Sequence, residues 1–325
     1  MKPSRYLVPL CALAFAQAVY AQPKAPAFPT KPIRLVAPTS AGGGNDIIAR
    51  LISVEMSNNW GQQVIVDLRP GAAGIIGSDI TAKAPPDGYT MVIVGTGHTM
   101  NPSLYSKLPF DALKDFEPIS MVAFAPLVFL VHPSLPVHSI KDLISVAKAK
   151  PGAYNHASAG SGTAGWLSVE RFKRMAGIEM THIPYKGAGD AVTSVVSGQV
   201  HLLSTGPTAV VQHIKVGRLR ALGVTSPKRA DILPDVPAIA ETVPGYEEQI
   251  YVAMLAPAKT PKVLLDRLHD EIHRILRLPN VKSRMDALGV VPGDMPRDKI
   301  GAYLTAQHAN AAKVFADLGI KPESW

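Results

Sequence analysis

The sequence predicts an α/β protein with two lobes and a ligand cleft between them. Short apolar runs alternate with helical periodicity for most of the chain, which is typical of α/β units. Most connections are rich in glycine and proline, and one glycine-rich strand-to-helix turn falls in each proposed lobe. With 325 residues, the chain is long enough for two ordinary domains or one large one.

Apolar runs bounded by turn residues predict the strands, and we expect them to be largely parallel because helices separate them. Phe116–Pro126 and Pro234–Gly245 look like crossings between lobes, so the second lobe, residues 126–245, is an insertion between residues 22–125 and 246–325 of the first. The predicted strands are Ile33–Ala37, Val64–Asp67, Met91–Val94, Leu127–Val131, Tyr154–Ser158, Met180–Ile183, Leu202–Ser204, Ala221–Val224 and Tyr251–Ala256.

Apolar residues at helical spacing predict the helices between these strands. Ser139 has a side chain suited to the N-cap of the helix that begins at Ile140. The predicted helices are Asp46–Asn58, Ile140–Lys148, Gly165–Met175, Ala188–Gly198, Ala209–Lys215, Pro261–Leu276 and Arg297–Leu318.

The first 21 residues read as a secretory signal peptide. Lys2 and Arg5 precede an apolar run, Leu7–Phe15, and small residues lead to a cleavage site between Ala21 and Gln22. The run is too short to span a bilayer, which takes about 20 apolar residues. We therefore expect export to the periplasm.

Charge and cysteine content exclude several classes of protein. Cys11 is the only cysteine and lies in the signal peptide, so the mature chain has no thiol for a disulfide, an iron–sulfur cluster or a nucleophile. Loss of Lys2 and Arg5 lowers the net charge from +8 to +6. A positive chain attracts anions, but no basic run long enough for nucleic acid is present, so we expect no nucleic-acid partner.

Two glycine-rich turns predict an anion site. Pro38–Asp46 contains three successive glycines after a strand, and Ala159–Gly165 has a similar place after Tyr154–Ser158. Glycine lets the backbone approach a ligand, while the helix that follows presents unpaired N–H groups and the positive end of its dipole. Each turn alone is also compatible with an ordinary flexible connection.

Further polar residues follow other strands, at the end of an open α/β sheet where ligands bind. Thr96 and Gly97 follow one strand, Ser204 and Thr205 end another, and Lys186 lies in a loop that we expect near the cleft; each also suits an ordinary polar turn or solvated loop. The predicted ligand-binding residues are Ser40, Gly42, Gly43, Gly44, Asn45, Asp46, Thr96, Gly97, Ser158, Ala159, Gly160, Ser161, Gly162, Thr163, Lys186, Ser204 and Thr205.

Sequence patterns that would indicate an enzyme are incomplete or missing. His269 and His273 share a helical face, but the zinc-protease pattern requires Glu after the first His, and here that residue is Asp270. No G-x-S-x-G elbow or P-loop occurs. We expect no catalysis, no metal and no cofactor; the rival hypothesis is a secreted hydrolase with a nucleophile such as Ser161.

Motifs along nearly the whole mature chain resemble the Bug-type receptors, the extracytoplasmic solute-binding components of tripartite tricarboxylate transporters. The order and the number of the shared segments carry the resemblance. The segments are Pro29–Ile33, Gly42–Asp46, Ala49–Arg50, Gly71–Gly74, Ile76–Gly77, Ala82–Thr90, Asn101–Pro102, Phe116–Ser120, His182–Gly187, Arg218–Leu222, Leu233–Pro237, Pro244–Tyr246, Ala256–Pro257 and Gly319–Lys321.

The resemblance implies a type II, Venus-flytrap periplasmic binding fold that captures a small organic anion, in particular a carboxylate, for delivery to membrane subunits. It implies that amides and hydroxyls of Ser40–Asp46 and Ser158–Thr163 hold the carboxylate. We expect a monomer. A sensor or an orphan receptor remains the alternative among binding proteins. The chain departs from the family at Trp166, where a histidine is usual.

Overall fold

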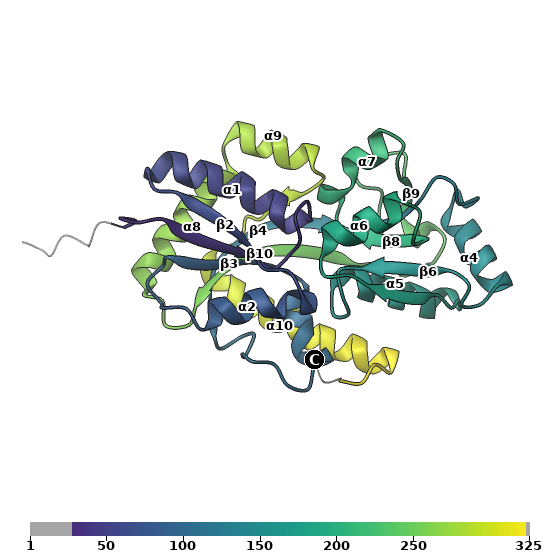
Figure 1. Ribbon diagram of the computed structural model, residues 1–325, viewed down its shortest axis with the longest axis horizontal. Coiled ribbons are helices and arrows are strands. Elements are labelled where there is room, and N and C mark those ends of the chain that lie inside the picture. Colours follow the sequence, from purple (N-terminus) through teal and green to yellow (C-terminus); the bar gives the residue numbers. More distant parts are fainter. Residues whose placement is uncertain (1–27, 323–325) are drawn as a thin grey trace, which may run out of the picture.

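The computed structural model describes residues 28–322 and contains two lobes, each built around its own sheet (Figure 1). This confirms the predicted two-lobed α/β fold. The predicted signal peptide, residues 1–21, lies outside the described residues. Within the described part of the chain, no helix combines the length and the apolar character needed to cross a membrane.

The first lobe contains a six-stranded mixed sheet. Strand β1, next to the edge strand β2, is parallel to β2 and β3, whereas β10 is antiparallel to β3 and β4. In spatial order the strands are β11 (Val291–Pro292), β4 (Phe116–Pro126), β10 (Gln249–Pro257), β3 (Thr90–Gly95), β1 (Ile33–Ala37) and β2 (Val64–Leu68).

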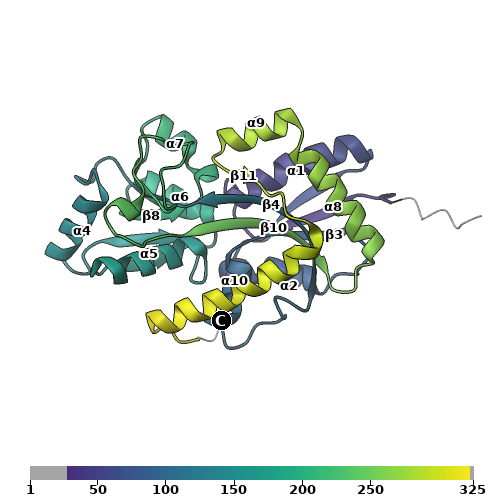
Figure 2. The same cartoon turned by 180° about the vertical axis from the view of Figure 1, so that it is seen from behind.

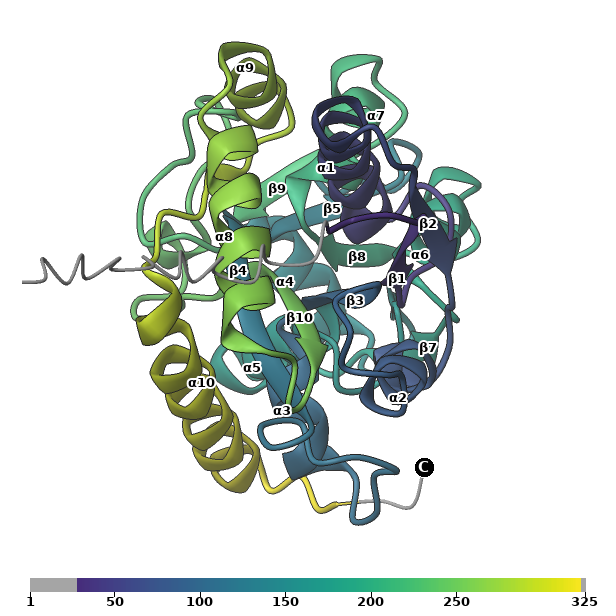
Figure 3. The ribbon, with the colours of Figure 1, turned by 90° about the vertical axis from the view of Figure 1, so that its left-hand side faces the viewer.

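Helices cover both faces of this sheet (Figure 3). Ile52 of α1 and Leu268 of α8 are buried against one face, and Ile75 of α2 and Ile300 of α10 against the other. Burial of an apolar helical stripe is the main source of stability for such helices. The helices are α1 (Gly44–Trp60), the 3₁₀ turn η1 (Ala72–Gly74), α2 (Ile75–Ala82), α3 (Gly97–Leu104), α8 (Lys262–Leu276), α9 (Pro279–Ala287) and α10 (Arg297–Leu318).

The second lobe repeats this layering around a five-stranded sheet. Leu143 of α4 and Phe172 of α5 are buried on one face, and Val195 of α6 on the other. The Ser139 hydroxyl accepts the N–H of Asp142 at 3.1 Å, which confirms the predicted N-cap. The strands, in spatial order, are β7 (Thr181–Pro184), β6 (Asn155–Ser158), β8 (Leu202–Thr205), β5 (Val128–Val131) and β9 (Arg220–Val224). The helices are α4 (Ile140–Ala149), α5 (Ala164–Ala176), α6 (Ala188–Val196), η2 (Pro207–Ala209), α7 (Val211–Lys215) and η3 (Ile239–Glu241).

The expectation of largely parallel strands is wrong, because both sheets are mixed. In the second lobe, β6 is parallel to β7 and β8, but β5 is antiparallel to β8 and β9. The antiparallel pairs involve β4, β5 and β10, which belong to the segments that carry the chain between lobes. Their direction is set by that passage rather than by a βαβ crossover.

Two crossing segments join the lobes at one place. Phe116–Pro126, predicted as a crossing, is the strand β4, and Leu127 leads directly into β5. The hydroxyl of the buried Thr225 accepts the N–H of Leu127 at 2.7 Å and donates to the carbonyl of Glu248 at 2.7 Å, so it ties the outgoing segment to the returning one. Pro234–Gly245, predicted as the second crossing, lies in the second lobe instead, because Ile239 and Val243 pack in its core. Tyr246 packs in the same core, although the predicted division assigns it to the first lobe.

A third connection comes from α10, which extends from the first lobe towards the second (Figure 2). Trp166 and Leu167 of α5 form a buried cluster with Ala311 and Phe315 of α10, and the Trp166 and Phe315 ring centroids are 6.0 Å apart. Trp166 therefore packs between the lobes.

Candidate functional site

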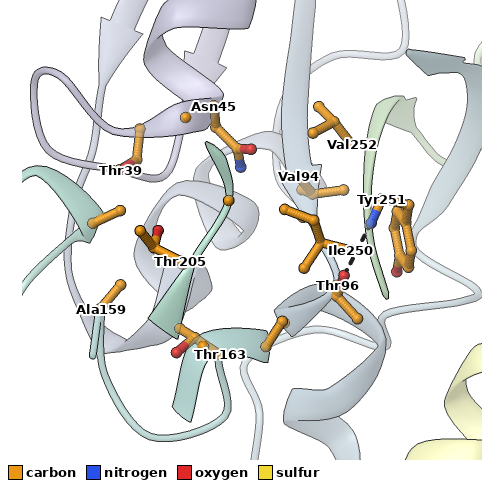
Figure 4. Close-up of a pocket in the computed structure, with 18 of the residues that line it drawn as sticks. Thr39, Asn45, Val94, Thr96, Ala159, Thr163, Thr205, Ile250, Tyr251 and Val252 are labelled. Atoms are coloured by element: carbon orange, nitrogen blue, oxygen red, sulfur yellow. Dashed lines mark hydrogen bonds between the residues drawn. The ribbon is translucent and has the colours of Figure 1, made fainter. Parts of the chain in front are cut away.

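A cavity of about 170 Å³ lies between the lobes (Figure 4). Asn45 and Val94 reach it from the first lobe, and Thr163 and Thr205 from the second. The volume is close to the roughly 150 Å³ that accommodates benzene in an engineered cavity. The site is therefore the size of one small organic molecule.

The N-termini of five helices meet at this cavity. The N-cap or first residue of α1, α2, α3, α5 and α6 lines it in each case: Gly44, Gly74, Gly97, Ala164 and Ala188. At α1, α2, α3 and α6 the N-cap residue supplies no side-chain hydrogen bond. Each N-terminus presents backbone N–H groups and about half a positive charge, so together they create a positive potential without a cationic side chain.

The residues that line the cavity include no Asp, Glu, Lys or Arg. The two titratable side chains among them are neutral at pH 7. Burial lowers the pKa of His98 to about 4, and its Nε2 lies 2.9 Å from the Ala112 carbonyl oxygen. Burial likewise raises the pKa of Tyr251, whose hydroxyl lies 2.8 Å from that of Thr99. A cation would find no countercharge here, whereas an anion meets helix N-termini.

Hydroxyl groups add further hydrogen-bonding capacity, but several are engaged by the protein. Thr163 caps α5 and donates to the Gly160 carbonyl oxygen at 2.8 Å, and the Ser204 hydroxyl accepts from Ser168 at 2.6 Å. Thr39 and Thr205 also line the cavity, and the side-chain amide of Asn45 points into it (Figure 4).

The lobes touch on both sides of the cavity. On one side, the Ser40 hydroxyl accepts the N–H of Asp190 at 3.3 Å, and a Cβ at Gly189 would overlap the Ala41 carbonyl oxygen. On the other, a Cβ at Gly97 would lie 3.0 Å from the Gly162 carbonyl oxygen. The structure is therefore a closed form, with the two lobes in contact on both sides of the cavity.

Eight of the predicted residues line the cavity, and they come from all four loops singled out in the sequence. Both glycine-rich turns and both shorter loops reach it, as expected for the carboxyl ends of neighbouring strands. These residues are Gly44, Asn45, Thr96, Gly97, Ala159, Thr163, Ser204 and Thr205.

The other predicted residues of the first turn do not line the cavity and instead shape the turn. Asp46 accepts the N–H of Gly42 at 2.9 Å and pairs with Arg50 at 2.7 Å, so its carboxylate is engaged within the lobe. A Cβ at Gly43 would overlap the Thr39 hydroxyl, so a larger residue there would displace the Thr39 side chain. Ser40 contacts the N-terminus of α6.

The remaining predicted residues of the second lobe also lie outside the cavity. Ser158 is buried; its hydroxyl accepts the N–H of Gly160 at 3.1 Å and lies 2.7 Å from Nε2 of His182. A Cβ at Gly162 would lie 2.5 Å from the amide oxygen of Asn101, so that turn packs against the first lobe. Three residues line a separate, more open hollow at the rim: Gly160, Ser161 and Lys186.

Several residues that line the cavity were not among the residues predicted from the sequence. Thr39 lies in the first glycine-rich turn, Gly74 ends the segment Gly71–Gly74, and Ala188 follows the loop of Lys186. Their closeness in sequence to glycine-rich or predicted site segments could have identified them. Ile250 and Val252 come from β10, and no feature of the sequence predicted that β10 pairs with β3. Their contribution depends on antiparallel pairing.

The histidine pair of α8 lies elsewhere. His269 Nδ1 is 2.8 Å from the Ile119 carbonyl oxygen, and His273 Nδ1 is 3.8 Å from Asp294. Within residues 28–322, no cluster of three or more His, Cys, Asp or Glu side chains is arranged to hold a metal ion.

Comparison with known proteins finds close relatives. Residues 48–320 match the sequence model of the family described as "Tripartite tricarboxylate transporter family receptor". A Pseudomonas sp. (strain P51) protein, described as a UPF0065 protein in the tcbD-tcbE intergenic region, is 40% identical over 266 residues, which cover 81% of this chain and 79% of that protein.

Solved structures share the fold. The periplasmic binding protein BugD is 31% identical and superimposes with a TM-score of 0.88 over 91% of this chain and 100% of that one. A structure described as R. palustris Rpa4515 with adipate is 34% identical, with a TM-score of 0.89 over 91% of this chain and 100% of that one. These matches confirm the resemblance that the motifs indicated.

Proposed function

The chain belongs to the tripartite tricarboxylate transporter receptor family, and from this premise we propose that it captures a small carboxylate in the periplasm and delivers it to the membrane subunits of such a transporter. The main support for a carboxylate ligand is that five helix N-termini meet around a cavity whose lining has no charged side chain. Each N-terminus stabilises a nearby anion by about 0.3–1 kcal/mol, and by up to about 2 kcal/mol where water is excluded. The adipate in a solved relative supports the same ligand chemistry.

Capture requires the lobes to open and close. In this proposal the inserted lobe, residues 126–245 together with Tyr246, moves against the rest of the chain about the crossing segments tied by Thr225. The ligand contacts both lobes and so stabilises the closed form. The contact between Ser40 and Asp190 forms only when the lobes meet.

The proposed receptor acts without changing its ligand. Each helix N-terminus supplies hydrogen-bond donors and a fixed potential, which suffice for binding. We propose no cofactor, metal or catalytic residue. The protein acts as a monomer after cleavage of the signal peptide near Ala21.

Thermal unfolding of the mature protein, Gln22 to Trp325, tests the proposal. Mono-, di- and tricarboxylates, and the amides of the same acids, are added separately. A saturable rise in melting temperature with carboxylates and not with the amides is expected, because a ligand that binds only the folded state stabilises it. Chromatography of the ligand after incubation must show that none is consumed.

A matched pair of variants locates the site. Thr205→Val removes a hydroxyl from the cavity, while Thr305→Val removes one from the exposed face of α10. Loss of a hydrogen bond to a charged ligand costs about 1.5–3 kcal/mol, or roughly a 10- to 150-fold rise in Kd. Only Thr205→Val should show this rise in Kd. If no carboxylate binds, or the stabilising compound is turned over, the proposal fails.

A further inference from the structure

The cavity has two ends that differ in chemistry (Figure 4). The polar end is formed by Thr39, by Thr163 at the N-cap of α5 and by Thr205 at the end of β8. Asn45 of α1 lies between the two ends, with its side-chain amide near Gly95 of β3. Three of the hydroxyls that line the cavity therefore lie on one side of it. An anionic group is best stabilised there.

The apolar end is formed by Val94 of β3 and by Ile250 and Val252 of β10. Figure 4 shows these three side chains together, on the side away from Thr205. The hydroxyl of Thr96 lies among them, but it accepts the N–H of Tyr251 at 3.2 Å. The first residue of α3, Gly97, also lies here next to Thr96, so the side chains at this end are mainly aliphatic but one helix N-terminus adjoins them.

We infer that the ligand is a monocarboxylate with a compact, uncharged, apolar body. Its carboxylate lies at the polar end and its body packs against Val94, Ile250 and Val252. The cavity of about 170 Å³ accommodates a single ring or a short aliphatic chain. This inference rests on the proposed function and makes its substrate class narrower.

A second charged group would be poorly placed in this cavity. A carboxylate at the apolar end would lose its hydration and would meet only the N-terminus of α3, with no cationic side chain among the residues that line the cavity, so it would be less well stabilised than one at the polar end. An ammonium group, as in an amino acid, would need an acidic partner, and no acidic residue lines the cavity. Asp46, the acid beside the first turn, is held by Gly42 and Arg50. Both arguments favour one carboxylate and no other charge.

Titration calorimetry with hexanoate and adipate tests the inference, because the two acids have the same chain length and differ by one carboxylate. Benzoate tests whether the cavity accepts a carboxylate whose apolar body is an aromatic ring. We expect hexanoate and benzoate to bind at least ten times more tightly than adipate, and each methylene buried at the apolar end to strengthen binding by about fourfold. Adipate binding as tightly as hexanoate or more tightly would overturn the inference but leave the carboxylate receptor intact. If none of the three binds and no other carboxylate does, the proposed function itself fails.

Variants at the apolar end provide a second measurement. Val252→Thr keeps the shape and adds a hydroxyl, and Ile250→Ala shortens a half-buried side chain should the first variant fold poorly. Both should weaken benzoate and hexanoate binding by about tenfold or more and change adipate binding by less than twofold. Thr205→Val, at the polar end, should weaken all three acids alike. An equal loss for every acid in the apolar-end variants would contradict the assignment of the two ends.

Discussion

Replacing Gly189 by alanine should separate lobe closure from folding stability. Gly189 is the second residue of α6, and its Cβ would overlap the carbonyl oxygen of Ala41 and lie 3.0 Å from the Ser40 hydroxyl, both across the interface. Its φ is not positive, so alanine suits the backbone. With the lobes apart nothing across the interface opposes the new methyl group, because Ala41 and Ser40 belong to the other lobe.

The two effects have opposite signs. In the open protein, alanine favours the helix by up to about 1 kcal/mol, less in the first turn than in the interior. In the closed protein, the extra methyl group forces the lobes apart or shifts a backbone carbonyl, at a cost of about 1–3 kcal/mol. Since the proposed capture places the ligand in contact with both lobes, the Kd should rise roughly 5- to 150-fold while the unliganded protein becomes slightly more stable.

Calorimetric titration of the carboxylate and urea unfolding without ligand measure the two quantities. Gly301→Ala is the matched control, because Gly301 lies in α10 and its Cβ would have only Pro118 near it, at 4.0 Å, within the same lobe. That variant should gain stability and keep the wild-type Kd. An unchanged Kd in Gly189→Ala would refute the reasoning that ligand binding requires this closed contact.

Two further predictions concern the segments that join the lobes. Burial raises the pKa of Glu248 from 4.5 to about 7, despite the opposing effect of Arg171. Between these pH values the folded chain therefore keeps a proton that the unfolded chain releases. The free energy of unfolding should fall by up to roughly 3 kcal/mol as the pH rises from 4.5 to 7. Glu248→Gln should flatten that decline in urea unfolding at pH 5 and pH 8, and an unchanged decline would contradict it. Thr225→Val leaves the buried N–H of Leu127 without its hydroxyl partner, so denaturant unfolding should show a loss of about 1–3 kcal/mol, and a loss below about 0.5 kcal/mol would show that the tie is weak.

Secondary structure was predictable where the local pattern was strong. Strand β1 and helix α10 have the predicted bounds, because one is a short, largely apolar run and the other a long segment bounded by Pro296 and Gly319. Helix α3 was missed, since it begins with Gly97 and contains Pro102. It forms because its buried residues Met100 and Leu104 pack in the cluster beneath α10. Tertiary packing here outweighs a weak local propensity.

The sequence by itself determined which loops build the site. Glycines and hydroxyls at the carboxyl ends of strands are local features, and both glycine-rich turns reach the cavity through Gly44 and Thr163. It did not determine which way each side chain points. In the same turns, Ser40 contacts the opposite lobe and Ser158 turns into its own core.

Only the tertiary structure decided these orientations and the shape of the cavity. The contact between Ser40 and Asp190 spans 150 positions in the sequence, and the apolar wall from Ile250 and Val252 exists because β10 returns antiparallel beside β3. A residue's own neighbours in the chain fix its local conformation, but its burial and its partners depend on segments brought together by the closure of two sheets. For that reason the anion chemistry could be inferred from the sequence, while the division into a polar and an apolar end could not.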